Sequence, residues 1–433
     1  MGDKIEKLYE KRKGLVPNAL GVFNPSTASK AKGSIIWDVE GRELIDFAGG
    51  IGVMNSGHNP EPVVKAIQKQ AENLIHTCFN VSMTEEYLDL AEKLVNLFPL
   101  GKETKVMLTN SGAESVENAI KIARMATGKQ GIIAFTGAFH GRTMMAMTLT
   151  SKTKYKTGCG PFAPEVYRLE YPYYFRYGEG LSEKEYINQQ IQKLKDFFLY
   201  QVSGDQIAAV ILELVQGEGG FTVMPPKYLK ALQKLCKENG ILIIVDEVQS
   251  GFGRTGKWAS YEHYDITPDI VTLAKSMGGG MPIGAVIGKA EIMDAAHAGT
   301  IGGTYPGNPV CCAASLANIE YMESVNINAL GEYVGEIVQN RFEYFKEKFE
   351  VVTDIRGLGA MLAIELSKNN DPAKPDAELA ANLIKVCEQK GLIIISAGTF
   401  GNCIRILSPL TISEKLLNKG LDILEEALTE LTK

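Results

Sequence analysis

The sequence lacks the features of a membrane-spanning or nucleic-acid-binding protein. No apolar stretch reaches the roughly 18–20 residues needed to cross a bilayer, so no membrane partner is expected. Lysine and arginine number 45 against 51 aspartates and glutamates, which gives a formal net charge of −6. This balance provides no broad basic surface, and no nucleic-acid partner is expected.

The sequence also lacks the marks of secretion and of metal binding. Its first residues, MGDKIEKLYEKRKG, are charged and contain no apolar signal-peptide core. The 7 cysteines are odd in number and form no C-x-x-C pair, which favours reduced thiols in a cytoplasmic protein. The 5 histidines show no metal-ligand spacing, and no H-E-x-x-H motif, P-loop or nucleophile elbow occurs. We therefore expect a cytoplasmic protein without a bound metal.

One nucleotide-binding motif is matched by its glycine spacing but not by its surroundings. Gly251, Gly253 and Gly256 match the G-x-G-x-x-G fingerprint. In a dinucleotide site these glycines directly follow a strand, and an acidic residue closes the next strand about 20 residues further on. Here residues 246–250 intervene, and no such acidic residue follows. An NAD-dependent oxidoreductase is therefore a minor alternative.

What the chain does contain is a long alternation of predicted strands and helices. Its 433 residues, 45% of them hydrophobic, suffice for two or three domains with sizeable cores. A hairpin is predicted over residues 34–46 with Gly41 in its turn, followed by a glycine-rich loop over 47–59. The alternation that follows predicts an α/β fold with a parallel sheet. Its predicted strands are 105–108, 132–135, 208–212, 241–245, 270–274 and 285–288, and its predicted helices are 62–75, 85–97, 113–126, 183–199, 226–239 and 311–323.

The last part of the chain predicts a smaller α+β domain. Its predicted strands lie near 351–356, 361–366, 392–395 and 403–406.

Two short apolar runs in the middle of the chain each end in a charged residue. Asp246 follows the run 241–245, and Lys275 follows the run 270–274. Neighbouring parallel strands would place both charges at one sheet edge, where α/β proteins build their sites. Burial lowers the pKa of a lysine from about 10.4 and so favours Schiff-base chemistry. A carboxylate keeps a pyridine nitrogen protonated, and the pair therefore predicts a site for pyridoxal 5'-phosphate (PLP).

The segment TNSGAE, residues 109–114, lies between a predicted strand and a predicted helix. Ser111 and Glu114 form a capping-box pattern, and Gly112 lets the backbone approach a ligand. The free N–H groups of the first helical turn make an anion site. Simple helix capping is an equally good interpretation of this motif alone.

Charged and aromatic side chains near later strand ends are further candidates. Phe139 suits stacking on a flat ring and Arg142 suits a bidentate carboxylate, with core packing and a surface ion pair as the plain alternatives. Glu213 and Glu218 flank a glycine turn, where they can orient a hydroxyl, neutralise an arginine or only be solvated. Arg405 lies inside an apolar run, and a buried arginine needs an anion from the protein or a substrate.

Seven motifs in order resemble those of class III PLP-dependent aminotransferases of fold type I, and among these the bacterial 4-aminobutyrate aminotransferases. They are NSGAESVENAIKIAR, GAFHGRT, VQGEGGF, DEVQSGFGRTG, LAKSMGGGMP, GGTYPGNP and DIRGLGAMLAIEL. The resemblance covers nearly the whole chain. It implies a large PLP-binding domain with a mostly parallel central sheet over residues 63–320. It also implies a smaller α+β domain built from both chain ends, with an N-terminal segment over 1–62 and a C-terminal part over 321–433.

The resemblance implies cofactor roles at the matching positions. Lys275 would hold PLP as a Schiff base and act as general base and acid, and Asp246 would pair with the pyridine nitrogen. Gln249 would bond the ring hydroxyl, and Thr304 would reach the phosphate of a neighbouring subunit, so a homodimer or a dimer of dimers is expected. The full implied cofactor set is Gly112, Ala113, Phe139, His140, Glu213, Asp246, Val248, Gln249, Lys275 and Thr304.

The resemblance also implies a substrate pair. The enzyme would move the amino group of 4-aminobutyrate to 2-oxoglutarate by a ping-pong cycle, giving succinate semialdehyde and glutamate. Arg405 would bind the α-carboxylate of glutamate, and Glu218 would neutralise Arg405 when an ω-amino acid is bound. Arg142 would hold the distal carboxylate of either substrate.

Two further positions bear on the donor. Ile51 would line the pocket beside the cofactor, and Asn80 stands where close relatives often have the longer Gln. The length of the donor therefore stays open, with 5-aminovalerate or another ω-amine as the alternative and an amino-acid racemase of the same fold as a weaker one.

Overall fold

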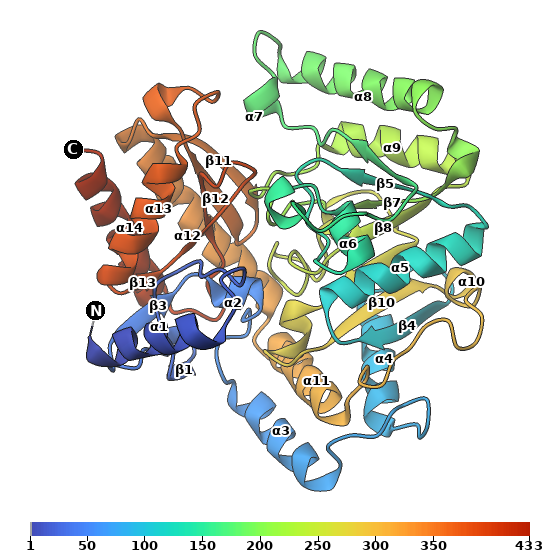
Figure 1. Cartoon of the computed structure of the whole chain (residues 1–433), viewed down its shortest axis with the longest axis horizontal. Coiled ribbons are helices and arrows are strands. Elements are labelled where there is room, and N and C mark those ends of the chain that lie inside the picture. The colour runs from blue at the N-terminus through green and yellow to red at the C-terminus, as the bar shows by residue number, and fades with distance from the viewer. Residues whose placement is uncertain (1) are drawn as a thin grey trace.

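The computed structural model describes residues 2–433 as a large and a small domain (Figure 1). The large domain is built on a seven-stranded sheet with the strand order β4-β10-β9-β8-β7-β5-β6. In this sheet β9, β8, β7, β5 and β6 run parallel, whereas β10 is antiparallel to both of its neighbours. The strand bounds are β4 Thr104–Thr109, β5 Gly131–Phe135, β6 Val166–Leu169, β7 Ile207–Leu212, β8 Leu242–Asp246, β9 Ile270–Leu273 and β10 Gly284–Lys289.

Both faces of this sheet are covered, which explains why its strands are almost continuously apolar. Successive side chains of β5 alternate between two cores. Ile132 and Ala134 pack in the core that includes α5 (Gly112–Thr127), and Ile133 and Phe135 join the core on the other face. The other helices of this part are α3 Glu61–Asn73, α4 Glu85–Leu97, α6 Met144–Leu149, α7 Tyr174–Tyr177, α8 Glu183–Tyr200, α9 Pro226–Asn239, α10 Ala290–Met293 and α11 Pro309–Ser324.

The small domain joins the two ends of the chain. β3 (Glu43–Asp46) pairs in parallel with β13 (Leu392–Ile393), in a sheet ordered β1-β2-β3-β13. A second sheet has the order β11-β12-β15-β14. The remaining elements are α1 Asp3–Leu15, β1 Lys30–Lys32, β2 Ile35–Trp37, α2 Gly49–Gly52, α12 Ile327–Lys348, β11 Val352–Leu358, β12 Met361–Leu366, α13 Ala377–Gln389, β14 Ile395–Ala397, β15 Cys403–Ile406 and α14 Glu414–Leu431.

The predicted α/β fold class, with a mostly parallel sheet and a smaller α+β domain, is confirmed. The hairpin over 34–46 forms as β2 and β3, and Gly41 takes a φ of +89° in its turn. The predicted helix 85–97 and the predicted strands 361–366 and 403–406 have the bounds of α4, β12 and β15. The domain limits 1–62, 63–320 and 321–433 stay a prediction.

Some elements differ from the sequence prediction. The predicted strand 392–395 is two strands, β13 and β14, which lie in different sheets. The loop over 47–59 contains the short helix α2, and the edge strand β6 was missed because VYRL shows no long apolar run. The connection between the parallel strands β8 and β9 contains no α-helix, and only residues 260–263 of it are helical, as a 3₁₀ turn.

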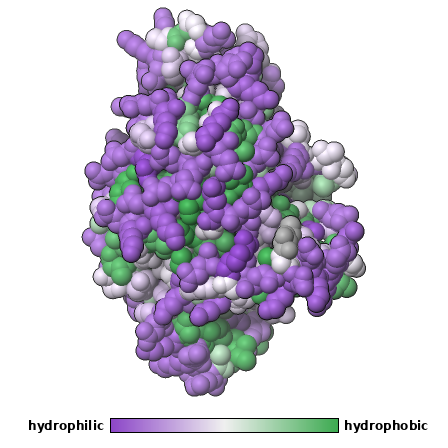
Figure 2. Space-filling model, turned by 90° about the vertical axis from the view of Figure 1, so that its left-hand side faces the viewer, coloured by the Kyte–Doolittle hydropathy of each residue, from purple (hydrophilic) through white to green (hydrophobic). Residues whose placement is uncertain are grey.

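The described residues, 2–433, include no helix that is both long and apolar enough to cross a membrane. They also hold no group of three or more His, Cys, Asp and Glu side chains that could bind a metal ion. Figure 2 shows the side of the molecule that lies to the left in Figure 1, and hydrophilic residues predominate on it, with apolar residues between them.

Candidate active site

A cavity of about 480 Å³ lies at the ends of β8 and β9, where the large and small domains meet. Asp246 ends β8 and is paired with Thr272 of β9, three residues before Lys275. The parallel pairing therefore brings the two charges to one sheet edge, as predicted. The residues that line the cavity are Phe23, Gly50, Ile51, Val53, Asn110, Ser111, Gly112, Ala113, Phe139, His140, Gly141, Arg142, Glu213, Gly217, Glu218, Asp246, Val248, Gln249, Ala274, Lys275, Gly280, Met281, Pro282, Ile283 and Arg405.

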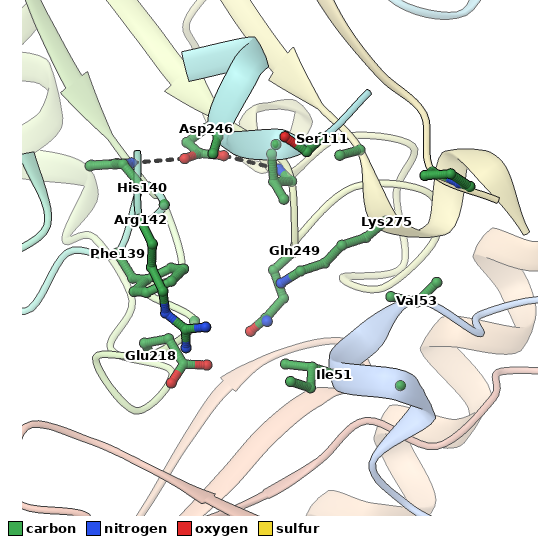
Figure 3. Close-up of a pocket in the computed structure, with 18 of the residues that line it drawn as sticks. Ile51, Val53, Ser111, Phe139, His140, Arg142, Glu218, Asp246, Gln249 and Lys275 are labelled. Atoms are coloured by element: carbon green, nitrogen blue, oxygen red, sulfur yellow. Dashed lines mark hydrogen bonds and ion pairs between the residues drawn. The ribbon is translucent and has the colours of Figure 1, made fainter. Parts of the chain in front are cut away.

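Asp246 is buried and held by two hydrogen bonds (Figure 3). His140 Nδ1 lies 2.7 Å from Asp246 Oδ2, and the Val248 N–H donates to Oδ1 at 3.1 Å. His140 Nε2 is buried and has no hydrogen-bond partner in residues 2–433. Because His140 and Val248 support Asp246 from behind, the carboxylate keeps a fixed position on the cavity wall.

Lys275 extends into the cavity from a strained backbone position. Its φ of +48° is unusual for a non-glycine residue, and the next residue, Ser276, donates its hydroxyl to the Gly52 carbonyl at 3.0 Å. Burial lowers the pKa of Lys275 to about 8, while the Glu218 carboxylate opposes the shift. A lysine with this pKa has a sizeable neutral fraction near neutral pH, which is the nucleophilic form.

The N-terminus of α5 forms one wall of the cavity. Ser111 caps the helix by accepting from the Glu114 N–H at 3.2 Å. The reciprocal half of the capping box is not made, since Glu114 Oε2 accepts from the Asn110 N–H at 2.8 Å. Gly112 and Ala113 are the first helical residues, so no carbonyl of the helix accepts from their N–H groups. A phosphate at this end would meet free donors and the positive end of the helix dipole.

Two side chains are placed for a flat ring with a polar edge. Phe139 is half-buried on the cavity wall, close to Arg142 in Figure 3. Gln249 is buried, and its Oε1 has no hydrogen-bond partner in residues 2–433. An unpartnered amide oxygen inside a cavity is costly unless a ligand pairs with it.

Glu213 lines the cavity, but both of its carboxylate oxygens accept hydrogen bonds from the backbone. It accepts from the Phe139 N–H at 2.9 Å and from the Gly217 N–H at 2.8 Å. Burial raises its pKa to about 7, against the effect of nearby His140. Glu213 therefore supports the loops that carry Phe139 and Glu218.

A buried ion pair crosses the cavity between the two domains. Arg405 of β15 lies with Nη1 2.6 Å from Glu218 Oε1, and only 3% of the Arg405 side chain is exposed. Burial of Glu218 favours its neutral form, but the Arg405 guanidinium outweighs this and lowers the pKa of the carboxyl. Arg142 is exposed and lies with its Cζ 5.6 Å from the centre of the Phe139 ring.

Ile51 reaches the cavity from α2 in a left-handed conformation. Its φ is +66°, which is strained for a β-branched residue. Figure 3 shows its side chain on the side of the cavity opposite Asp246, facing Lys275 and Gln249. The glycine-rich segment before it, which favoured a loop in the sequence, gives the backbone this turn.

Thr304 and Asn80 do not line the cavity of the single chain. Both are exposed, and they lie on neighbouring segments, because a Cβ placed on Gly302 would be 3.0 Å from Asn80 Nδ2. Every other predicted site residue lines the cavity.

The glycines of the G-x-G-x-x-G match are also away from the cavity. A Cβ on Gly253 would be 3.0 Å from Ile327, and one on Gly256 would be 2.7 Å from Glu332, so this turn packs tightly on α12. Its glycines serve domain packing, which removes the main reason for an NAD site.

Several side chains at or next to the cavity were not predicted from the sequence, among them Phe23, Val53 and Tyr155. Phe23 and Val53 line it, and Tyr155 contacts Arg142 and Glu218 at its edge. Phe23 and Tyr155 lie in irregular or short 3₁₀ segments with no periodic pattern. Only their aromatic character in polar surroundings could have marked them.

The geometry fits PLP: a lysine and an aspartate at one sheet edge, a helix N-terminus, a flat aromatic wall and an unpartnered amide. Solved structures with the same fold belong to PLP-dependent transaminases of fold type I. An (S)-enantioselective omega-transaminase from Thermomicrobium roseum superimposes with a TM-score of 0.91 at 29% identity, over 99% of each chain. An amine transaminase from an uncultivated Pseudomonas species, solved in its PLP-bound form, gives a TM-score of 0.89 at 27% identity over 96% of each chain.

The chain belongs to the class III aminotransferase family, whose model matches residues 20–428. It is 46% identical to a probable 4-aminobutyrate aminotransferase of Bacillus subtilis, over 97% of this chain and 96% of the relative. It is 45% identical to the 5-aminovalerate aminotransferase DavT of Pseudomonas aeruginosa, over the whole of both chains. It is 42% identical to the 4-aminobutyrate aminotransferase GabT of Escherichia coli, over 98% of each. The protein is therefore a PLP-dependent aminotransferase, as the motif order predicted.

Proposed function

We propose that this aminotransferase transfers the terminal amino group of an ω-amino acid, 4-aminobutyrate first, to 2-oxoglutarate, with succinate semialdehyde and glutamate as products. The observation that carries the proposal is the Arg405–Glu218 ion pair in the cavity that also contains Lys275. It presents an arginine that is neutralised when no α-carboxylate is bound.

The two substrates differ at the carbon that reacts. Glutamate has a carboxylate beside this carbon, and 4-aminobutyrate has none. With 4-aminobutyrate bound, Glu218 compensates the charge of Arg405, so no bare cation faces an apolar methylene. With 2-oxoglutarate bound, the substrate carboxylate takes the place of Glu218 on Arg405. Arg142 would hold the carboxylate at the far end of both substrates.

PLP supplies the ring that accepts the electrons of the carbon–hydrogen bond that breaks. Lys275 would hold the cofactor and then, as a neutral amine, take the proton from the reacting carbon and return it elsewhere. Asp246, kept in place by His140 and Val248, would keep the pyridine nitrogen protonated. The Gln249 amide would bond the ring hydroxyl, and the N–H groups of Gly112 and Ala113 would bind the phosphate.

We also propose that the active form is a homodimer or a dimer of dimers, acting in the cytoplasm. Thr304 is exposed beside Tyr305, which is 64% exposed, and exposed apolar residues lie on the segment that contains Asn80. Exposed apolar side chains of this kind favour a protein interface. The exposed apolar residues here are Leu74 and Ile75, which follow α3, and Val81 and Met83, which follow Asn80. Light scattering on the purified protein measures the oligomeric state, and a monomer would exclude a role for Thr304 across subunits.

The donor is tested by half-transamination. Enzyme loaded with PLP is mixed with 4-aminobutyrate without a keto acid, and loss of the cofactor absorbance near the visible range is followed. We expect fast bleaching by 4-aminobutyrate and recovery on addition of 2-oxoglutarate. Bleaching by other amines but not by 4-aminobutyrate would overturn the donor.

A second donor, 5-aminovalerate, is favoured by the names of two relatives. Two proteins that match over the full length of both chains, at 45% and 44% identity, are named 5-aminovalerate aminotransferases. A donor panel with 4-aminobutyrate, 5-aminovalerate, β-alanine, ornithine and lysine separates the two proposals by their kcat/KM values.

A further inference from the structure

Tyr155 lies at the edge of the cavity and contacts both carboxylate-binding regions. It ends a 3₁₀ turn over Thr153–Tyr155 and is half-buried. Its hydroxyl donates to Glu218 Oε2 at 3.2 Å. Its ring lies 5.0 Å from Arg142 Cζ and packs edge-on against Phe139, with the ring centres 5.2 Å apart.

Glu218 thus uses its two oxygens differently. Oε1 pairs with Arg405 at 2.6 Å, and Oε2 accepts from Tyr155. When a ligand carboxylate takes Arg405, Glu218 loses its cation while 16% of its side chain is exposed. A carboxylate left without a partner in such a place is strongly unfavourable. The bond to Tyr155 involves the other oxygen, so it can persist when the ion pair opens.

We propose that Tyr155 is a positioning residue that retains Glu218 after Arg405 has turned to a ligand carboxylate, and that it thereby favours binding of dicarboxylates over monocarboxylates. The inference rests on the proposed pairing of 2-oxoglutarate with Arg405. Tyr155 would then affect the choice between substrates through its hydrogen bond to Glu218.

The surroundings of Tyr155 support this role. Burial raises the pKa of its hydroxyl, and the Glu218 carboxylate adds to the shift, so the hydroxyl stays protonated and can donate. Lys152 is a further cation close enough to Glu218 for the Glu218 charge to affect its pKa. Its Nζ donates to the Gly398 carbonyl at 2.8 Å, and the Gly398 N–H donates to the Glu218 carbonyl at 3.0 Å. Lys152 therefore holds the backbone of this loop, and Tyr155 contacts the carboxylate itself.

The test compares binding of glutarate and pentanoate to the PLP-loaded enzyme by calorimetry. Both have five carbons and no reacting carbon, but only glutarate carries a second carboxylate, which must displace Glu218. Tyr155→Phe keeps the ring beside Arg142 and removes the hydroxyl. We expect glutarate binding to weaken about tenfold, as loss of a hydrogen bond to a charged group does, and pentanoate binding to change less than about twofold.

Three further variants separate the proposed role from a general structural one. Tyr167→Phe is the matched control, because Tyr167 donates to the Glu165 carboxylate at 2.8 Å on an exposed surface, and it should alter neither affinity. In a Glu218→Ala background, Tyr155→Phe should have no further effect on glutarate. Tyr155→Leu also removes the ring and should weaken pentanoate as well. Thermal unfolding of each variant verifies that it is folded.

Two results would overturn the inference. One is equal weakening of glutarate and pentanoate by Tyr155→Phe, and the other is persistence of its glutarate effect in the Glu218→Ala background. Failure of the proposed function is visible separately, in the unmodified enzyme. That enzyme would then bind glutarate no more tightly than pentanoate, or fail to recover its absorbance with 2-oxoglutarate.

Discussion

The two halves of the cavity are built in different ways. The cofactor half consists of Asp246, Lys275 and the start of α5, all on or next to regular elements of the large domain. The carboxylate half consists of Arg142, Glu218 and Arg405, which come from two loops and a small-domain strand. Strand ends in a packed sheet give fixed positions, whereas loops between domains can shift. With the proposed roles, the chemistry that is the same for every substrate would lie on the half built from strand ends, and adaptation to two substrates would lie on the half built largely from loops.

Loss of Lys275 should break the cofactor half most severely. Lys275→Ala removes the amine that would bind PLP and move the proton, so kcat should fall by more than about 10³-fold. Borohydride should no longer fix the cofactor to the protein. Lys289→Ala is the control, since Lys289 pairs with Asp269 at 2.5 Å away from the cavity and should leave both measurements unchanged. Turnover in Lys275→Ala close to that of the unmodified enzyme would refute the assignment.

Loss of the Asp246 charge should be the next largest effect. Asp246→Asn keeps the shape and removes the anion beside the pyridine nitrogen, so kcat should fall about 10²-fold or more in both half-reactions. Stopped-flow measurement of each half-reaction provides the values. Asp269→Asn, at the residue directly before β9, should change stability but not kcat. An Asp246→Asn effect confined to one substrate would place Asp246 in the carboxylate half instead.

Changes in the carboxylate half should affect the kinetic constants of the two half-reactions to different extents. Arg405→Lys replaces a planar fork by a point charge, so KM for 2-oxoglutarate should rise about 10- to 100-fold while the 4-aminobutyrate half-reaction changes less. Glu218→Gln should act in the opposite sense, lowering kcat/KM for 4-aminobutyrate because Arg405 is left uncompensated. Steady-state kinetics with each substrate varied measures the split. Equal losses for both substrates in both variants would contradict the proposal that Arg405 pairs with Glu218 in one half-reaction and with the substrate carboxylate in the other.

The difference between regular elements and loops also explains what could be predicted from the sequence. β8 and β9 are apolar runs closed by Asp246 and Lys275, so pattern alone placed these two residues together. Arg405 was marked by its position inside an apolar strand. Tyr155 and Phe23 have no such signal, because the path of an irregular loop depends on tertiary packing. The strand predicted over 392–395 also failed, since one apolar run serves two sheets and no local pattern marks the change.

Thr304 and Asn80 mark a further limit. The role predicted for Thr304 concerns a neighbouring subunit, and the role predicted for Asn80 concerns the substrate pocket and the length of the donor. In the single chain both are exposed and outside the cavity. Nothing in one chain's packing constrains them, so their assignments rest on the resemblance and on the proposed dimer.

The smallest expected effect is a pH dependence of stability that belongs to the cofactor half. In the cofactor-free protein, burial lowers the pKa of Lys275 from 10.5 to about 8. Between these values the unfolded chain holds a proton that the folded protein has released, so this residue makes stability rise with pH across that window.

Below about pH 8 Lys275 is protonated in both the folded and the unfolded state, and its charge is then buried at full cost. Lys275→Met removes this cost, so the variant should unfold at a higher temperature than the unmodified protein near pH 7. The difference should shrink as the pH rises from about 8 towards 10.5, as measured by calorimetry of both proteins without PLP. A difference that is constant over this range would show that Lys275 is charged in the folded protein throughout, and would remove the neutral amine from the proposed mechanism.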